Sequence, residues 1–162
     1  MLSALSLGAT LYMPATRPDL WQVVNGEKYP ELRSLVICLE DAVSEHEVEA
    51  AKVNLRQLLR QVQDQPRQAQ HPKIFIRPRH IAMAEELAQW PELIMADGMV
   101  LPKFCLNQLR QWQQILPDFI QVMPTLEDAE TFEMDNTDNE TRAEWYLRQI
   151  RGSSNFSGAN WL

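Results

Sequence analysis

Cysteine and glycine are both scarce in this chain, with two and five residues respectively. Cys38 and Cys105 each lie inside an apolar run, a spacing that suits neither a disulfide framework nor a zinc site. So few cysteines are typical of the reducing cytoplasm, where we expect the protein to work. No histidine lies near Cys38 in the sequence to activate it, so we interpret its thiol as a buried packing group.

Long hydrophobic runs and clusters of basic residues are also missing. No stretch approaches the roughly 20 apolar residues of a membrane span, and residues 1–15 lack the basic start of a signal peptide. The net charge is −7, and the fifteen Lys and Arg residues are dispersed along the chain. Binding to nucleic acid requires a concentrated basic surface, so the sequence argues against nucleic acid and against a membrane as partners.

Short apolar runs alternate with helix-like segments along the chain. The runs that we predict to be strands are Ala9–Met13, Ser34–Leu39, Lys73–Arg77, Gly98–Leu101 and Phe119–Met123. Their hydrophobicity is continuous rather than alternating, as expected for strands that are covered on both faces of a parallel sheet. This pattern predicts an α/β fold, either a barrel or an open doubly wound sheet. No glycine-rich phosphate-binding motif follows the first strand, which weakens the nucleotide-binding versions of the open sheet.

The clearest predicted helix follows the second strand. Ser44 is a good N-cap, and Glu47 three residues later would complete a capping box. One apolar stripe at helical spacing then follows, formed by Val48, Ala51, Leu55, Leu58, Leu59 and Val62. Two further segments, Ala82–Trp90 and Leu106–Leu116, also have helical periodicity. Residues 64–72, rich in Gln and Pro, are predicted to form a surface loop.

Charged side chains come directly after the apolar runs, again and again. They are Arg17, the pair Glu40 and Asp41, Arg77, Lys103 and Glu127. In α/β barrels, the chemistry collects where the strands end and the following loops begin. One such residue has a simple explanation, since every strand must end in something polar. The repetition at successive strands instead predicts a functional site.

Five segments of the chain carry motifs that point to a known family. They read LYMPATRPD (Leu11–Asp19), ICLEDAV (Ile37–Val43), IFIRPR (Ile74–Arg79), DGMVLPK (Asp97–Lys103) and MPTLEDAE (Met123–Glu130). In this order they resemble the segments L-F-V-P-G, F-D-L-E-D-A-V, V-R-I-N, D-G-I-V-L-P-K and P-L-I-E-T-A of the citrate lyase β-subunit-like carbon–carbon lyases, within the aldolase/citrate lyase superfamily. The second and fourth segments are the most specific.

The resemblance implies a (β/α)₈ barrel, a TIM barrel, and a set of site residues. Family members cleave or form a carbon–carbon bond in 3-hydroxyacyl thioesters or 2-oxo-3-hydroxy acids, usually with Mg²⁺. By resemblance, Arg77 binds a carboxylate or carbonyl oxygen of the substrate, and Glu127 is a metal ligand. Glu40 and Asp41 match an acidic pair near the metal, and Lys103 joins these acids in a charge network. The base that takes the hydroxyl proton stays unassigned.

Two further positions belong to the predicted site. Arg17, just after the first strand, is a candidate for binding a substrate phosphate or carboxylate. The family's second metal ligand is an Asp in a G-x-x-D-L segment, which residues 152–156 resemble, with Asn155 in place of the Asp. A neutral amide can offer one oxygen to Mg²⁺ but removes a charge that contributes to the attraction. The resemblance therefore implies a metal pair of Glu127 and Asn155 that is weaker than the family's.

The length of the chain sets it apart from a whole barrel. A complete TIM barrel takes about 250 residues, whereas this chain has 162. We therefore expect a partial, truncated barrel of five to six βα units over residues 1–151, followed by a flexible tail at 152–162.

Three functional hypotheses compete on the sequence alone. The first is a Mg²⁺-dependent lyase that acts on a small molecule, with a coenzyme A thioester among the candidate substrates and a homo-oligomeric state, since family members commonly form trimers or hexamers. The second is a catalytically inactive remnant, or a binding module, that keeps the pocket without a complete metal site. The third is an unrelated open α/β binding protein, which would make the five ordered motifs a coincidence.

Overall fold

Five parallel strands form one sheet in the computed structural model, which describes residues 4–127. The strands are β1 (Thr10–Pro14), β2 (Ser34–Cys38), β3 (Lys73–Arg77), β4 (Gly98–Leu101) and β5 (Gln121–Pro124). Their order in the sheet is the order of the chain, and each strand pairs in parallel with the next. Strands β3 and β4 begin and end as the sequence predicts, while β1, β2 and β5 differ from the prediction by one or two residues.

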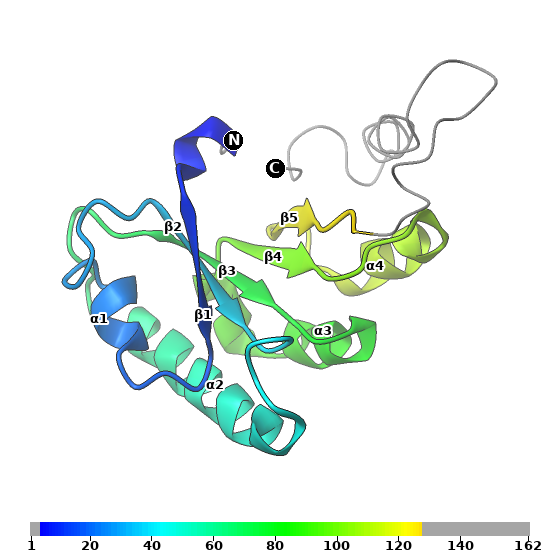
Figure 1. The fold of residues 1–162 in the computed structure, drawn as a ribbon, viewed down its shortest axis with the longest axis horizontal. Helices are drawn as coiled ribbons and strands as arrows, with labels where there is room; N and C mark the ends of the chain where they lie inside the picture. The colour runs from blue at the N-terminus through cyan, green and yellow to red at the C-terminus, as the bar shows by residue number, and fades with distance from the viewer. Residues whose placement is uncertain (1–3, 128–162) are drawn as a thin grey trace.

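The helices lie along the outside of this arc of strands (Figure 1). They are α1 (Leu20–Val24), α2 (Val48–Asp64), α3 (Ile81–Ala88) and α4 (Leu109–Ile115), with short 3₁₀ turns η1 (Ala4–Leu7), η2 (Glu45–Glu47), η3 (Pro91–Met95) and η4 (Leu106–Gln108). A doubly wound sheet must reverse its strand order and place helices on both faces. Because the order β1 to β5 never reverses, the described residues form part of a barrel, and the open-sheet alternative is wrong.

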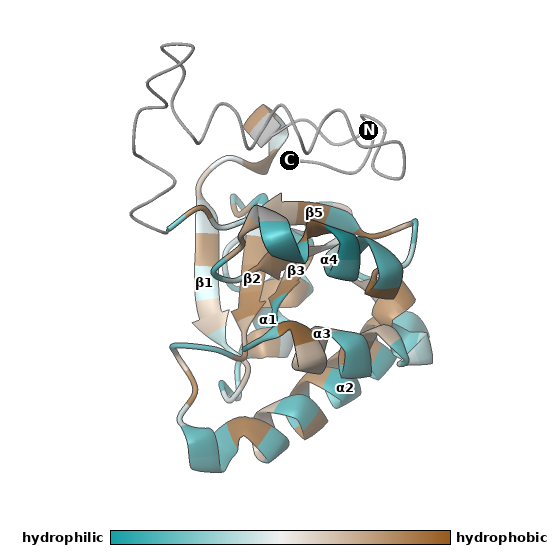
Figure 2. Ribbon diagram, turned by 90° about the vertical axis from the view of Figure 1, so that its right-hand side faces the viewer, coloured by the Kyte–Doolittle hydropathy of each residue, from teal (hydrophilic) through white to brown (hydrophobic). Residues whose placement is uncertain are grey.

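Side chains on both faces of the sheet are buried, which explains the continuous apolar runs. In β2, Leu35 and Ile37 pack into the large core beneath the helices, while Val36 faces the inside of the arc. Figure 2 shows the central strands as strongly hydrophobic and α2 as striped. The six stripe residues predicted for α2 are all buried. Together with the strands they form the main core, which holds the sheet in place as a platform for its loops.

The inner face of the arc has its own small cluster. Val36, Phe75 and Val100 pack there, and Leu7 from η1 covers them at the amino-terminal end. Gly98 is required at this face, because a Cβ atom at that position would lie 2.3 Å from the Phe75 ring and 2.6 Å from the carbonyl oxygen of Gln121.

Two local features differ from the sequence prediction. Ser44 is at an N-cap position, as predicted, but it caps the 3₁₀ turn η2, through which the chain enters α2. Its hydroxyl donates to the Glu47 carboxylate instead of accepting a backbone N–H, so the predicted capping box is incomplete. Helix α1 was missed, because five residues are too few to show a helical period. Among the helices of residues 4–127, none has the length and apolarity needed to cross a membrane.

Candidate active site

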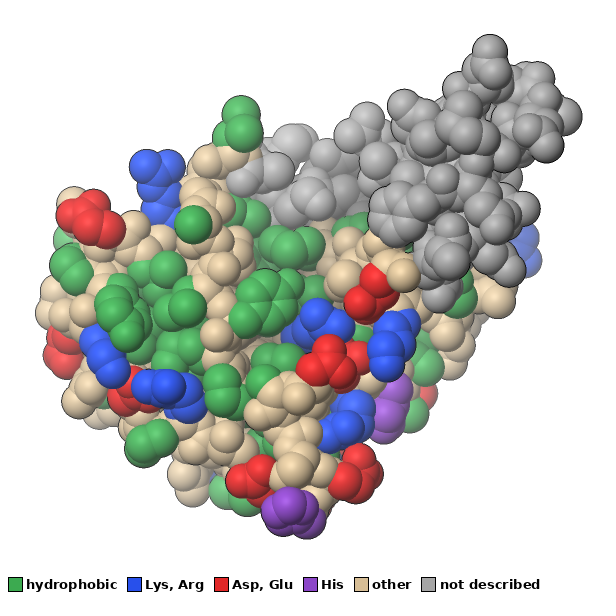
Figure 3. Space-filling view, in the orientation of Figure 1, with side chains coloured by type: hydrophobic (Ala, Val, Ile, Leu, Met, Phe, Trp, Pro, Cys, Tyr) green, Lys and Arg blue, Asp and Glu red, His purple; other side chains and the backbone are tan. Residues whose placement is uncertain are grey.

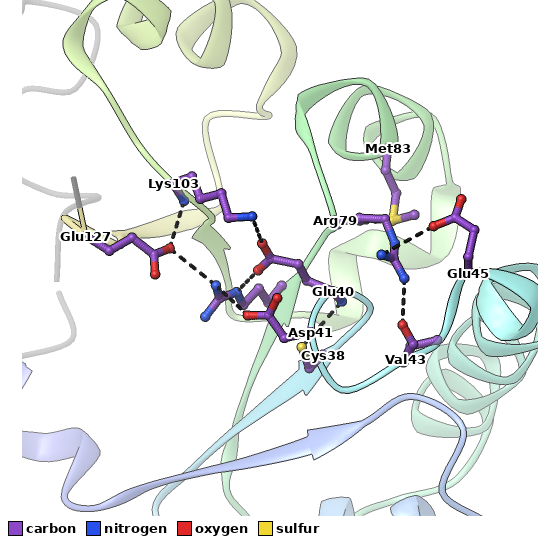
Figure 4. Close-up of polar contacts among 10 residues, drawn as sticks. Cys38, Glu40, Asp41, Val43, Glu45, Arg79, Met83, Lys103 and Glu127 are labelled. Carbon is purple, nitrogen blue, oxygen red and sulfur yellow. Dashed lines mark hydrogen bonds and ion pairs between the residues drawn. The ribbon is translucent and has the colours of Figure 1, made fainter. Parts of the chain in front are cut away.

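Arg77 is the last residue of β3 and the centre of a charged cluster. It shares its face of the strand with Phe75, so its side chain projects into the inside of the arc at the carboxyl end of the sheet. Its side chain is 11% exposed and contacts three carboxylates, from Glu40, Asp41 and Glu127 (Figure 4). A guanidinium has five donors in a planar fork, which allows it to bind several oxygens at once.

Glu40 is the most deeply buried acid of this cluster, with 3% of its surface exposed. Its Oε2 accepts a hydrogen bond from Arg77 Nε. The loop that carries it is fixed by its backbone, since Leu39 N donates to the carbonyl of Arg77 at 2.9 Å and Glu40 N donates to Cys38 Sγ at 3.4 Å. The buried thiol of Cys38 therefore helps to position Glu40, in keeping with the structural role expected for it.

The second carboxylate comes from the end of β5. Glu127 Oε1 lies 3.4 Å from Arg77 Nη2 and accepts the backbone N–H of Lys103 at 3.1 Å. Asp41 Oδ2 lies 3.5 Å from the same Arg77 nitrogen, but its side chain is 75% exposed. Lys103 Nζ approaches Glu40 Oε1 at 3.6 Å. The structure thus brings together Glu40, Asp41, Arg77, Lys103 and Glu127, which come from the ends of β2, β3, β4 and β5.

The carboxylates of the cluster stabilise the positive charge of the Arg77 guanidinium. Burial on its own lowers the pKa of Arg77, but the hydrogen bond and charge of Glu40 and the charge of Glu127 outweigh it and raise that pKa. The guanidinium therefore stays protonated at any physiological pH. Three carboxylates face two cations, so the cluster carries one net negative charge. In the space-filling view, acidic and basic side chains lie side by side near the middle of the molecule (Figure 3).

The donor set fits a cation that needs few protein ligands. Within residues 4–127, no three His, Cys, Asp or Glu side chains are grouped so as to hold a metal ion. Mg²⁺ commonly binds through one or two carboxylates and keeps several waters, so it does not need such a group. Glu40 Oε1 is also buried and has no hydrogen-bond donor. A buried acceptor without a partner is costly, and a cation or a water held by one would satisfy it.

Other charged residues near these loops do not join the cluster. Arg17 makes a two-pronged ion pair with Asp19 at 2.7 Å. Its side chain is 46% exposed, so it is not part of a buried cluster. Arg79 turns away from Arg77, donates to the carbonyl of Val43 at 2.6 Å and approaches Glu45 at 3.4 Å. His80 caps α3 by accepting the backbone N–H of Met83 at 3.1 Å. Asn155, the predicted partner of Glu127 at the metal, lies outside the described residues.

A hollow of about 830 Å³ lies elsewhere, at the amino-terminal ends of the first two strands. Its walls include Thr10, Leu11, Leu32 and Arg33. The carboxyl ends of the strands, and not this end, hold the chemistry of α/β barrels. We therefore locate the candidate site at Arg77 by its charged groups rather than by the volume of a cavity.

One contributor to the site could not be predicted from the sequence. This contributor is the backbone N–H of Lys103, which donates to Glu127 Oε1, and the φ of Lys103 is 45°. Lysine is not a residue that favours this conformation, so no turn motif could have indicated it.

The comparison with protein families agrees with the fold. The model of the carbon–carbon bond lyases of the TIM-barrel fold matches residues 1–149. None of the curated proteins compared with the chain is similar enough to count as a match. Because the family model covers most of the chain, this protein belongs to the carbon–carbon bond lyases of the TIM-barrel fold, and the resemblance seen in the five motifs is confirmed.

Proposed function

We propose that this protein is a Mg²⁺-assisted lyase of the citrate lyase β-subunit type, which cleaves a hydroxyacyl thioester or a 2-oxo-3-hydroxy acid by a retro-aldol reaction. The observation that carries the proposal is the convergence of Glu40, Asp41 and Glu127 on Arg77 at the carboxyl end of the sheet. In a carbon–carbon bond lyase with a barrel fold, this is the end at which such chemistry takes place.

Arg77 is the residue best placed to bind the substrate. Retro-aldol cleavage develops negative charge on the oxygen of an enolate, and a fixed cation next to that oxygen stabilises the transition state. The guanidinium is held on one side by Glu40 and on the other by Glu127, so its plane is fixed before the substrate arrives. Its remaining donors would bind a carboxylate or a carbonyl oxygen of the substrate in two-pronged fashion.

Glu127 is the residue that would hold the metal, with Asn155 as a second ligand. When bound, Mg²⁺ would supply positive charge against the developing enolate. Glu40 and Asp41 would orient water molecules around the site or move a proton, and Lys103 would balance the charge of Glu40. Arg17, which lies in the first βα loop, would meet a more distant phosphate or carboxylate of the substrate after exchanging its partner Asp19. Asp19 would keep Lys28 as its partner after such an exchange.

Cleavage assays with matched variants test the proposal. We would incubate the chain and MgCl₂ with a panel of 3-hydroxyacyl coenzyme A thioesters and 2-oxo-3-hydroxy acids, and detect the two fragments by mass spectrometry. Removing one transition-state donor typically costs about 100-fold or more in rate, and we expect this loss in Arg77→Lys and in Glu127→Gln. Glu85→Gln, an exposed acid on α3, is the control and should retain full activity.

Two outcomes would contradict the proposal. One is the absence of any cleavage across the panel by a folded parent chain, which would favour an inactive binding module. The other is cleavage that survives undiminished in Arg77→Lys, because the site would then lie elsewhere.

A further inference from the structure

The backbone of Lys103 has a conformation that residues with a side chain seldom adopt. Its φ of 45° is in the left-handed region, and no other residue except glycine has a positive φ between positions 4 and 127. A Cβ atom is crowded against the carbonyl oxygen in this conformation, so it persists only where the surroundings hold it.

Backbone hydrogen bonds at Lys103 and its neighbours connect the loop after β4 to the segment after β5. In this conformation the N–H of Lys103 donates to Glu127 Oε1, 3.1 Å away. The next residue continues the connection, since Phe104 N donates to the carbonyl of Thr125 at 3.1 Å, while Thr125 N donates to the carbonyl of Leu101 at 2.9 Å. The loop after β4 is thereby tied to the segment that carries Glu127.

The side chain of Lys103 makes much weaker contacts. It is 71% exposed, and its Nζ lies 3.6 Å from Glu40 Oε1, which is beyond hydrogen-bond distance. An ion pair of this length, with an exposed lysine as one partner, contributes little. The sequence drew attention to the charge of this lysine, but in the structure its amide makes the better contact with the cluster.

We propose that Lys103 is a positioning residue that acts through its main chain. Its amide fixes the Glu127 carboxylate through Oε1 and so presents this carboxylate to the cation. The consequence for metal binding depends on the proposed function, whereas the amide–carboxylate contact itself does not.

Three neutral substitutions separate the backbone from the charge. Lys103→Gly removes the charge and adopts a positive φ freely, Lys103→Met removes the charge and keeps the shape, and Lys103→Val removes the charge and opposes the conformation. We would measure the affinity for Mg²⁺ from the rise in melting temperature of the full chain with increasing MgCl₂. Gly and Met, which share the loss of charge, should bind Mg²⁺ with equal affinity, and Val about tenfold more weakly than either, as the loss of one charge-assisted hydrogen bond requires.

Amide hydrogen exchange in the metal-free protein provides an independent test. Glu127→Ala should speed exchange at the Lys103 amide about tenfold, because its acceptor is gone. The Phe104 amide, which is bound to Thr125, is the internal control and should be unaffected. This measurement uses variants away from position 103, so it remains decisive if Lys103→Val fails to fold.

The outcomes separate this inference from the proposed function. If all three neutral variants change Mg²⁺ affinity equally, or if Glu127→Ala leaves exchange at Lys103 unchanged, the positioning role is wrong. If the parent shows no response to Mg²⁺ while the exchange result holds, the amide does position Glu127 and the proposed metal site is wrong.

Discussion

Two buried glutamates of this protein are held by arginine, in different regions and in different ways. Glu40, at the carboxyl end of the sheet, is 3% exposed, and Glu92, in η3 against α2, is 7% exposed. Glu92 accepts from Arg56 Nε at 3.1 Å through both oxygens and from Arg60 Nε at 2.7 Å. Glu40 is bonded by Arg77 through one oxygen only, and the other has no hydrogen-bond donor.

The difference distinguishes a structural ion pair from a candidate site. A carboxylate whose two oxygens are satisfied has no capacity left for a ligand, so Glu92 is most simply a tie between η3 and α2. Glu40 keeps an unused acceptor at an otherwise charged centre, which is costly for stability alone. A buried polar atom without a partner calls for an explanation, and a bound ligand or water is one.

Breaking the Arg77 pair should have the largest effect on stability. Arg77→Met leaves Glu40 buried without its partner, and we expect the free energy of unfolding to fall by about 3–5 kcal/mol. Urea denaturation measures the loss. The double variant Glu40→Leu/Arg77→Met is the control and should recover most of it, because an apolar pair costs no desolvation. A loss below about 1 kcal/mol in the single variant would mean that Glu40 finds another partner, for which Lys103 is the nearest candidate.

A matched pair of substitutions tests whether the two glutamates have different tasks. Glu40→Gln should lower turnover about 100-fold or more, because the role proposed for Glu40, moving a proton or orienting water, requires its carboxylate. Glu92→Gln has the same shape change and should leave turnover unaffected while lowering stability at neutral pH. Steady-state kinetics and urea denaturation of both variants provide the comparison. An equal loss of turnover in Glu40→Gln and Glu92→Gln would mean that the two glutamates do not have different tasks.

The stability contributed by Glu92 should depend on pH in a defined window. Hydrogen bonds from Arg60 and from the backbone of η3 lower the pKa of Glu92 from 4.5 to about 2. A lowered pKa stabilises the folded state fully above pH 4.5, and this contribution is lost as the pH falls towards 2. The stability gap between the parent and Glu92→Gln should therefore be constant from pH 7 to about 5, shrink steadily below pH 4.5 and close only near pH 2. A gap that is undiminished at pH 3, or that is already closed at pH 4, would contradict the assigned cause.

The sequence predicted the candidate site better than it predicted the Glu92 tie. The runs KIFIR and GMVL predicted the first and last residues of β3 and β4, because an apolar strand ends sharply at a proline or a charge. Parallel strands bring their carboxyl ends together, so Arg77, Glu40 and Glu127 were expected to meet. Glu92 was not singled out, because an acid beside a proline is ordinarily exposed. Its partners Arg56 and Arg60 lie one turn apart on α2, and only the packing of η3 on that helix reveals the set.

Arg17 shows the limit of reasoning from strand ends alone. The position after β1 was predicted correctly as a loop, but the sequence could not tell that Asp19, two residues on, would bind its guanidinium. Local pairs of this kind form within the loop itself, whereas Arg77 has no acid within its own loop and is left for the carboxylates of neighbouring strands.

The smallest expected effect distinguishes the two arginines of Glu92 from each other. Arg56 also lies over the ring of Trp90, with 5.2 Å between the guanidinium carbon and the ring centroid, whereas the described contacts of Arg60 are with Glu92 alone. A double-mutant cycle of Arg56→Gln and Trp90→Leu should show a coupling of about 0.5–1 kcal/mol. The same cycle with Arg60→Gln is the control and should show none. Equal coupling in both cycles would mean that Trp90 acts by holding η3 as a whole, and that the cation–π contact contributes nothing of its own.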